Sequence, residues 1–286
     1  MRLRLFGAAA LVGLSALARA QVAPQNPYLP DAVAGPRSMA MGDAFRAVGT
    51  SNDAIVEDPA ALAVTQRYEV DGFFGYSFGA PATYWNGSIV DASSTPVATG
   101  ISYTHLASGS SSDRFSGASL RLALAVPLSD QIFIGVSGEW LNYGLSETVH
   151  AITGDASLVI KPIDMLTLAA IGYNLIGIES LLAPREVAVA AAYGSDETFH
   201  VAGDAVGNLS TPSLVLDYHL GGEYLLANLV AFRAGWMFDG LLDSHFLSGG
   251  VGLVTPGVGL DVAYRQQLGG LDDKLLIVDI KFFLPT

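Results

Sequence analysis

Apolar and polar residues alternate in short stretches that recur along the chain after residue 67. In residues 116–126, Leu120 and Leu122 share one face of an extended chain, whereas Ser119 and Arg121 lie on the other. A period of two indicates β-strands rather than helices. The same period returns in residues 132–140, 214–224, 258–265 and 276–282. We expect about fourteen strands, an even number as in bacterial barrels. The predicted ranges are 68–78, 82–91, 97–106, 115–126, 132–143, 148–160, 166–176, 185–194, 199–206, 213–224, 229–238, 246–254, 258–266 and 274–284.

The two faces of these strands differ in a way that is not typical of a soluble sandwich. One face is continuously apolar, and the other carries small residues and isolated charges instead of many Lys and Glu. After residue 20 no apolar stretch is long and charge-free enough to be a spanning helix, which needs about 20 residues. Only helices and closed barrels satisfy their backbone hydrogen bonds in lipid. The sequence therefore predicts an all-β fold, a transmembrane antiparallel β-barrel with a lipid-facing exterior and a polar lumen.

The connections between the predicted strands alternate in length. Counted from the first hairpin, the odd connections are mostly longer than the even ones. Outer-membrane barrels have long extracellular loops and short periplasmic turns, with both termini in the periplasm. The odd connections include 107–114, 177–184, 207–212, 239–245 and 267–273, and the even ones include 127–131, 161–165, 195–197, 225–228 and 255–257. This asymmetry predicts a bacterial outer-membrane location, with lipid around the barrel.

The first twenty residues have the layout of a secretory signal peptide. Arg2 and Arg4 form a basic start, residues 5–17 are an uncharged apolar run, and Ala-Arg-Ala at 18–20 precedes the expected cleavage site. This run is too short to span a bilayer, so we expect it to be removed. The predicted organisation is a signal peptide at 1–20, a segment at 21–67 inside or below the barrel, and the barrel at 68–286.

The composition of the chain excludes several kinds of functional site. The chain has 286 residues, no Cys, 14% charged residues and a formal net charge of -13. The absence of Cys excludes disulfides, cysteine-bound metals and thiol nucleophiles, and the negative charge argues against a nucleic-acid partner. The five His show no hydrolase signature, so we expect no catalytic residues, no enzyme activity and no cofactor.

The segment 21–67 does not have the pattern of a spanning strand. Asp58 before Pro59 is a typical helix start, with a capping side chain followed by proline at the first position, and it predicts a short helix from Pro59 to about Val64. The segment is too small to form its own core. We therefore expect it to lie in the barrel or across its periplasmic mouth, and we call it the hatch.

Three motifs in the hatch resemble the N-terminal pattern of the FadL-type outer-membrane channels, a group that includes the PorV/PorQ-like proteins of type IX secretion. Residues 37–45 resemble the stretch around Gly-Met-Gly-Gly-Ala-Phe, residues 52–54 the acidic middle, and residues 58–63 the Asn-Pro-Ala-Gly-Leu-Ala end, with Asp for Asn and Ala for Gly. The residues that we assign to the hatch motif are Met41, Gly42, Phe45, Asp53, Asp58 and Pro59. The resemblance implies a fourteen-stranded barrel with an N-terminal hatch, and either a hydrophobic-compound channel or a secretion-associated protein.

Charged side chains on the predicted inward face are candidates for the lumen. The lumen-lining candidates are Arg121, Glu139, Asp204, Asp217, His219, Arg233 and Arg265. They are consistent with a polar pathway for a solute, but a network of ion pairs holding the hatch explains them better. For that network we expect Arg121 and Arg233 to pair with acids of the hatch, namely Asp43, Asp53, Glu57 or Asp58.

A metal site is an alternative interpretation of one hairpin. His200 and Asp204 on one predicted strand could converge with Asp217 and His219 on the next, and these are acceptable zinc or iron ligands. Carboxylates and unpaired His are common in such lumens, so we predict no metal there.

The leading functional hypothesis is an outer-membrane barrel that binds or passes a small hydrophobic molecule. The alternative is a PorV/PorQ-like partner in protein secretion or surface attachment, which would form a stable protein complex. A soluble secreted β-protein is a third hypothesis, and the need for detergent separates it from the other two.

Overall fold

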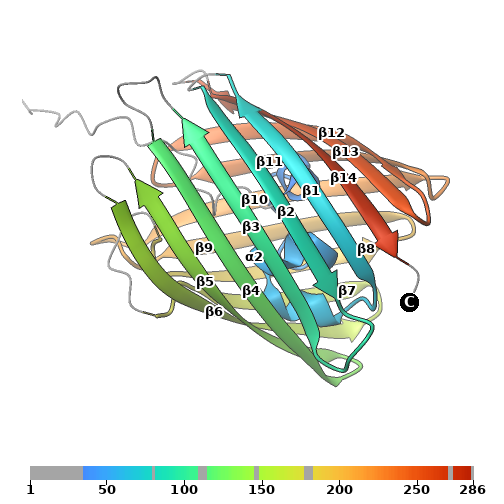
Figure 1. The fold of residues 1–286 in the computed structure, drawn as a ribbon. Helices are drawn as coiled ribbons and strands as arrows, with labels where there is room; N and C mark the ends of the chain where they lie inside the picture. The colour runs from blue at the N-terminus through green and yellow to red at the C-terminus, as the bar shows by residue number, and fades with distance from the viewer. Residues whose placement is uncertain are drawn as a thin grey trace, which may run out of the picture.

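The computed structural model describes residues 35–78, 81–108, 115–144, 148–176, 183–269 and 273–284. The predicted signal peptide lies outside these residues. Fourteen antiparallel strands close into a barrel in which β1 pairs with both β2 and β14 (Figure 1). The strands are β1 (Tyr68–Ser77), β2 (Ala82–Asp91), β3 (Ala98–Ser108), β4 (Phe115–Ser129), β5 (Ile132–Gly144), β6 (Thr148–Ile163), β7 (Leu166–Tyr173), β8 (Glu186–Ser195), β9 (Phe199–Asn208), β10 (Val215–Leu226), β11 (Val230–Asp239), β12 (Ser244–Val254), β13 (Val258–Leu268) and β14 (Lys274–Leu284). The predicted fold class and strand number are confirmed.

The strand register is continuous around the wall. Tyr68 pairs with Leu284 and Ser77 with Leu275 at the two ends of the seam between β1 and β14. Among the paired residues, register shifts occur between Pro127 and Ser129 and between residues 160 and 163, both next to short turns. Closure therefore gives each strand two hydrogen-bonded neighbours and leaves no open sheet edge.

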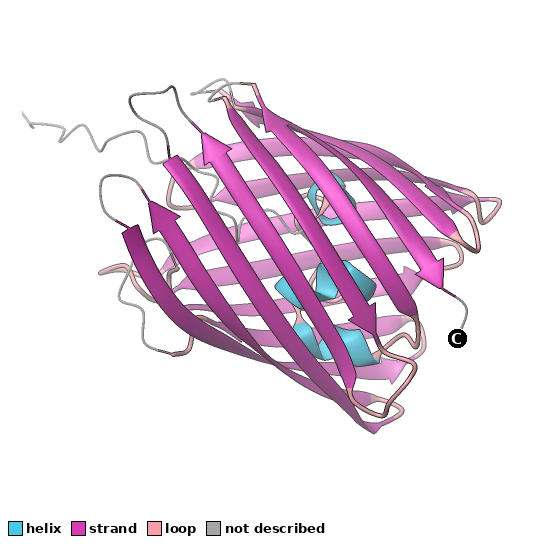
Figure 2. Cartoon of the chain, in the orientation of Figure 1, coloured by secondary structure: helices cyan, strands magenta, loops and turns pink. Residues whose placement is uncertain are grey.

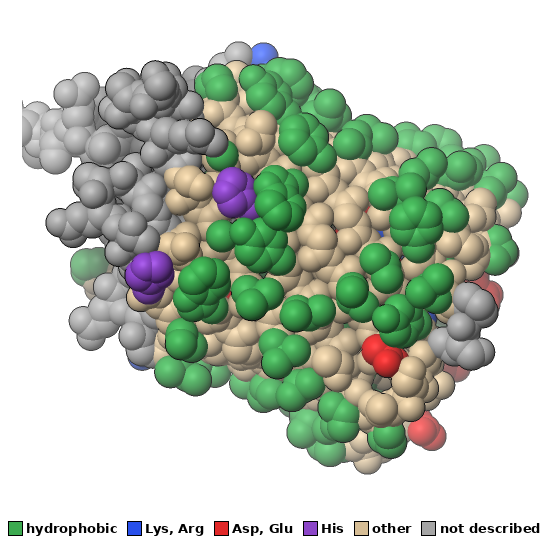
Figure 3. Space-filling view, in the orientation of Figure 1, with side chains coloured by type: hydrophobic (Ala, Val, Ile, Leu, Met, Phe, Trp, Pro, Cys, Tyr) green, Lys and Arg blue, Asp and Glu red, His purple; other side chains and the backbone are tan. Residues whose placement is uncertain are grey.

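The outer face of the barrel is apolar. Val189, Leu220 and Val251 lie on three different strands and keep 63%, 55% and 50% of their surface exposed. Figure 3 shows one side of the molecule, on which hydrophobic side chains cover the strands and charged ones are sparse. Such a surface suits lipid and not water. Within the described ranges, no helix is long and apolar enough to cross a membrane.

The described part of the hatch lies inside the barrel (Figure 2). It contains the helix α1 (Pro36–Ala40), the 3₁₀ helix η2 (Ser51–Asp53), the helix α2 (Ala54–Glu57) and the 3₁₀ helix η3 (Pro59–Ala63). α1 contacts β11 to β14, η2 contacts β1 and β2, and η3 contacts β3 to β6, so the hatch reaches most of the lumen circumference.

Small inward-facing side chains leave room for the hatch. Phe45, Ile55 and Leu62 of the hatch are at most 1% exposed and belong to a hydrophobic core shared with the wall. The wall contributes mainly alanines to this core: Ala123, Ala125, Ala169, Ala188, Ala190, Ala192 and Ala202. The predicted strand faces thus place the small residues where the hatch needs space.

The start of η3 agrees with the cap expected from its sequence. The Asp58 side chain accepts a hydrogen bond from the Ala60 N–H at 3.0 Å, and Pro59 occupies the first helical position. The predicted helix is a 3₁₀ helix that ends at Ala63, one residue earlier than expected. Short helical segments of this length often adopt the tighter 3₁₀ geometry.

Candidate functional site

The turn that follows α1 touches the wall through its backbone. Gly42 has φ 67°, a left-handed conformation that favours glycine. A Cβ atom on Gly221 of β10 or on Gly235 of β11 would collide with the backbone of Met41 or Gly42. His219 Nδ1 donates to the Gly42 carbonyl oxygen at 2.9 Å. Glycines on both sides therefore permit a backbone-to-wall approach that larger residues would block.

A second close approach fixes η3 against β5 and β6. The Ala60 N–H also donates to Ser157 Oγ at 2.8 Å. A Cβ atom on Gly135 would collide with the backbone of Pro59 and Ala60. The hatch is thus docked at two places on opposite parts of the circumference, each with a glycine in the wall.

Arg46 forms the polar centre of the hatch. Its Nη1 lies 3.2 Å from Asp204 Oδ2 and its Nε donates to Tyr173 Oη at 2.9 Å. Asp204 Oδ2 also accepts the backbone N–H groups of Phe45 at 3.1 Å and Arg46 at 3.2 Å. Glu57 of the hatch lies 3.6 Å from Arg46 Nη2. The carboxylate of Asp204 therefore binds both the hatch backbone at Phe45 and Arg46 and the side chain of Arg46.

Three further ion pairs join the hatch to β10, β13 and β14. Asp43 meets Arg265 Nη1 at 2.9 Å and Asp53 meets Lys281 Nζ at 3.4 Å. Arg37 of α1 donates to Glu223 Oε1 at 2.6 Å. All these charges are largely withdrawn from solvent, so removing one partner would leave a buried charge without compensation.

The predicted partners of two arginines are wrong. Arg121 Nη1 lies 2.6 Å from Asp155 and its other terminal nitrogen contacts Glu139, while Arg233 contacts Asp261 and lies 2.5 Å from Glu223. These acids belong to the wall, not to the hatch. The reason is the strand register, which places Arg121 opposite Glu139 and Arg233 opposite Glu223.

The candidate metal ligands do not converge. Asp204 and His219 are opposite in the β9–β10 register, but Asp204 binds the hatch and His219 binds the Gly42 carbonyl. His200 Nδ1 lies 3.5 Å from Glu223. Across the described ranges, no three His, Cys, Asp or Glu side chains are grouped so that they could hold a metal ion.

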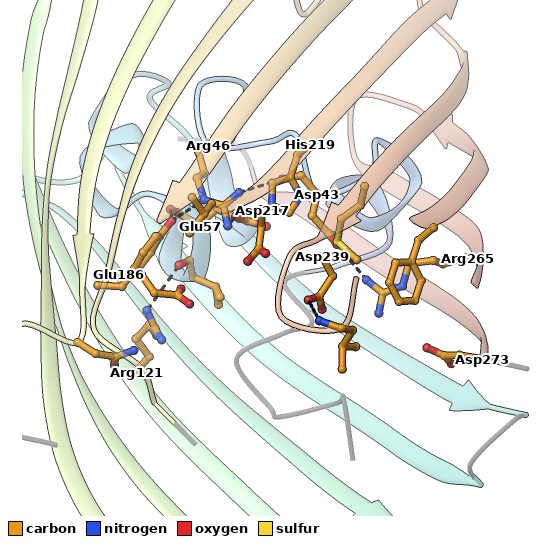
Figure 4. A pocket seen from close by; sticks show the side chains of 17 residues that line it. Asp43, Arg46, Glu57, Arg121, Glu186, Asp217, His219, Asp239, Arg265 and Asp273 are labelled. Atoms are coloured by element: carbon orange, nitrogen blue, oxygen red, sulfur yellow. Dashed lines mark hydrogen bonds and ion pairs between the residues drawn. The ribbon is translucent and has the colours of Figure 1, made fainter. Parts of the chain in front are cut away.

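A cavity of about 220 Å³ lies between the hatch and the barrel end that carries the longer connections. We call it the loop-side cavity. Its hatch boundary is Asp43, Arg46, Val56 and Glu57. Figure 4 shows acidic side chains spread across the remaining wall. The wall residues are Arg121, Tyr173, Asn174, Glu186, Val206, Asp217, His219, Met237, Asp239, Leu242, Phe246, Arg265 and Asp273.

Burial changes the acid–base properties of the hatch. The pKa of Glu57 is raised to about 7 by burial, partly offset by the Arg46 charge and by the hydrogen bond from Ser38. Burial likewise raises the pKa of Asp58 to about 7, offset by hydrogen bonds from Ser157 and from the backbone of Ala60. The docked hatch therefore favours the protonated form of both acids.

The sequence-predicted site residues occupy two regions. The hatch-motif side chains Met41, Phe45, Asp53 and Asp58 are at most 4% exposed, and they lie among wall residues. The lumen candidates Arg121, Glu139, Asp204, His219, Arg233 and Arg265 are at most 7% exposed, and Asp217 is partly exposed in the loop-side cavity.

Sequence reasoning missed several residues that the structure brings to the site. Arg46, Tyr173, Glu186 and Asp239 line the loop-side cavity, and none was a candidate. Glu186 could have been found, because it shares the alternating face of its strand with Ala188. Arg46 gave no such signal, since the path of the hatch has no period from which its contacts could be read.

Comparison with family models and with curated proteins finds no match. Solved structures are similar to the chain. The CymD monoaromatic hydrocarbon channel matches with a TM-score of 0.69 at 14% identity, over 88% of this chain and 97% of that chain. The Ralstonia pickettii toluene transporter TbuX matches with a TM-score of 0.67 at 14% identity, over 88% and 98%.

A Pseudomonas aeruginosa FadL homologue matches with a TM-score of 0.66 at 13% identity, over 87% of this chain and 97% of that chain. At such low identity the likeness shows a shared fold. The chain therefore has the fold of the FadL-type channels, as the resemblance of its hatch motifs implied.

Proposed function

We propose that this protein is an outer-membrane channel that binds a small hydrophobic molecule and passes it across the membrane. The observation that carries the proposal is a hatch enclosed in a fourteen-strand barrel whose outer face is apolar. The similar structures named as a monoaromatic hydrocarbon channel and a toluene transporter support transport as the activity. They are not enzymes by name, which agrees with a role without catalysis.

The location follows from the same features. The apolar exterior suits the hydrocarbon layer, and the closed strand ladder suits the outer membrane of a bacterium. We propose that residues 1–20 direct export and are cleaved, with residues 21–67 as the hatch and residues 68–286 as the barrel.

The mechanism that we propose is movement of the hatch. A solute would enter from the loop-side cavity, where Arg46 and Glu57 form part of the floor. The hatch blocks the route below that cavity because its core residues pack against the wall. Release of its ion pairs would open a path, and the barrel could remain closed because its strands pair with each other and not with the hatch.

Deletion of residues 41–63 tests whether the hatch controls passage. We expect the variant to keep a folded barrel, with faster toluene uptake into proteoliposomes and a higher single-channel conductance. Heat-dependent gel mobility would verify the folded barrel. Unchanged uptake and conductance in a folded variant would contradict gating by the hatch.

A reversible disulfide between the hatch and the wall gives a matched control for that experiment. Asn52 Nδ2 of the hatch lies 2.5 Å from Ser88 Oγ of the wall, so Asn52→Cys with Ser88→Cys puts thiols on two side chains that contact each other, in a chain that has no native Cys. Oxidation should stop uptake and reduction should restore it in the same protein. Transport that continues at full rate in the oxidised form would show that this part of the hatch stays in place during passage.

The secretion or surface-attachment hypothesis finds no support in the structures reported above, which are a monoaromatic hydrocarbon channel, a toluene transporter and a FadL homologue.

A further inference from the structure

The loop-side cavity carries more acids than its bases can neutralise. Its lining contains six acids and three arginines. Asp43 pairs with Arg265, Glu57 lies beside Arg46, and Arg121 is engaged by acids of the wall outside the lining. Among the residues that the structure describes, the other four lining acids form no ion pair: Glu186, Asp217, Asp239 and Asp273.

These four acids receive few hydrogen bonds. Asp217 accepts one from the Gly240 N–H at 2.7 Å and Asp239 accepts one from the Leu242 N–H at 2.8 Å. Asp273 is 8% exposed, and neither of its carboxylate oxygens has a hydrogen-bond partner in the described part of the chain. A buried carboxylate without a donor is costly, so these acids favour a cationic donor, which the described residues do not supply.

A buried amide in the same lining also has an oxygen without a hydrogen-bond donor among the described residues. Asn174 is 9% exposed, and its nitrogen donates to the Pro184 carbonyl at 2.9 Å. Its Oδ1 atom has no donor among the described residues. Asn174 follows Tyr173, which pairs with Glu186 across β7 and β8, so this free acceptor lies next to one of the unpaired acids.

The arrangement of the acids favours an organic cation over a metal ion. A metal would require several ligands within about 2–2.6 Å of one point. The described residues contain no such group, and Figure 4 shows the carboxylates spread from Glu186 past Asp217 and Asp239 to Asp273. A cation attached to a larger organic body can use several of these positions in turn.

The rest of the lining supplies apolar contacts for such a body. Val56 of the hatch and Val206, Met237, Leu242 and Phe246 of the wall line the same space. The volume of about 220 Å³ is below the roughly 300–1,000 Å³ typical of drug-sized ligands, so the occupant must be small.

We propose that the loop-side cavity selects small hydrophobic molecules that carry a protonated amine, which the carboxylates of Glu186, Asp217, Asp239 and Asp273 attract. The inference rests on the proposed channel function and assigns its substrate class. The same carboxylates repel anionic molecules of the same size, so carboxylate-bearing hydrocarbons are disfavoured. Neutral hydrocarbons gain no charge interaction.

Three probes with one skeleton test this selectivity. Benzylammonium, benzyl alcohol and benzoate share a benzyl or benzoyl body and differ in charge. Their uptake into proteoliposomes containing the full mature chain is measured at pH 7 and constant ionic strength, and liposomes without protein provide the passive background. We expect the protein-dependent rate for benzylammonium at low concentration to exceed the rates for the other two by at least about tenfold, which corresponds to about 1.4 kcal/mol.

A variant pair separates the cavity from general surface charge. Glu186→Gln with Asp239→Asn removes two charges from the lining, and Asn can still accept the Leu242 N–H. This double variant should reduce the preference for benzylammonium to about threefold or less. Asp164→Asn with Asp130→Asn removes two charges from exposed turns at the other end of the barrel and should keep the wild-type preference.

The possible outcomes distinguish this inference from the function on which it rests. Equal protein-dependent uptake of all three probes overturns the selectivity and keeps the channel. No protein-dependent uptake of any probe or of toluene overturns the channel itself. Retention of the preference in the cavity variant, or its loss in the turn variant, shows that other charges select the substrate. Displacement of benzylammonium by stoichiometrically bound calcium at fixed ionic strength identifies an inorganic cation as the occupant and also overturns the inference.

Discussion

At the scale of single residues, Arg46 determines how firmly the hatch is docked. It contacts Asp204 and Tyr173 of the wall and lies near Glu57 of its own segment. The side chain of Arg46 is only 12% exposed and that of Asp204 is fully buried. Loss of the guanidinium would therefore leave acids without their cation in a low-dielectric environment.

Arg46→Met should destabilise docking by about 3–5 kcal/mol, the usual cost of breaking a buried ion pair. The amides of residues 41–63 should then exchange with solvent at least about a hundredfold faster, as measured by hydrogen–deuterium exchange in detergent. Arg185→Met is the control, because Arg185 is exposed and donates through its backbone to Ser210. Equal protection in both variants would show that apolar packing alone docks the hatch.

Docking should also depend on pH through Glu57 and Asp58. Burial raises the pKa of Glu57 from 4.5 to about 7, and the charges of Asp43 and Asp204 act in the same direction while Arg46 opposes them. The docked state therefore binds more protons than the released state between pH 4.5 and 7. Docking weakens as the pH rises through this window, by an amount of the order of 1 kcal/mol per unit for each acid, and becomes constant above it.

The measurement is protection of the hatch amides between pH 4.5 and 8, corrected for the intrinsic exchange rate. Glu57→Gln should reduce the slope, and Glu57→Gln with Asp58→Asn should remove it, since Asn keeps the capping oxygen. Glu197→Gln changes an exposed acid in a turn and should leave the slope as it is. Docking that strengthens with rising pH would contradict the assignment.

At the scale of elements, the contact between η3 and β5 depends on the absence of one side chain. A Cβ atom on Gly135 would overlap the backbone of Pro59 and Ala60, which cannot move without losing the hydrogen bond to Ser157. Gly138 lies on the outer face of the same strand, and its Cβ would meet no atom within 4 Å.

Gly135→Ala should therefore displace η3 while Gly138→Ala does not. We expect a protease added to the purified barrel to cut within residues 58–63 in the first variant and to leave the second intact. Uptake of a hydrophobic probe should rise in the first variant, since the displaced element no longer fills the lumen. A resistant hatch in Gly135→Ala would mean that the wall, and not η3, gives way.

Strand β13 shows how much of the structure can be predicted from the sequence alone. The period of two predicted β13 as 258–266, against Val258–Leu268 in the structure, and it assigned Arg265 to the lumen. Strand faces are predictable because successive side chains must alternate. The pairing of Arg121 with Glu139 was harder to predict, because a register shift between Pro127 and Ser129 lies between this pair and the turn.

The contacts between the hatch and the wall could not be predicted from the sequence. Asp43 reaches Arg265 and Phe45 reaches Asp204 because the irregular backbone turn at Gly42 and Asp43, both with positive φ, directs the chain across the lumen. No periodicity encodes such a path. The sequence could indicate that residues 21–67 are not a strand and have one capped helix start, but not which wall residues they meet.

At the scale of the whole molecule, the polarity of a soluble protein is inverted. The interior contains ion pairs such as Arg121 with Asp155 and Lys281 with Asp71, while the exterior is formed by leucine, valine and aromatic side chains. This distribution is stable only where hydrocarbon replaces water on the outside, so the fold and its environment depend on each other.

A charge placed on the outer face should therefore cost an amount that depends on depth. Leu220 lies at the middle of β10 and is 55% exposed, whereas Leu226 lies at its end and is 48% exposed. In a bilayer, Leu220→Arg should destabilise the barrel by about 2–4 kcal/mol and Leu226→Arg by about 0–1 kcal/mol. Guanidinium titration of the barrel folded into lipid vesicles measures both. A soluble secreted β-protein would tolerate the two changes equally, because an exposed arginine at either position would face water. A depth-dependent difference thus establishes that β10 crosses a membrane, and equal small effects would refute the barrel's transmembrane placement and with it the proposed channel.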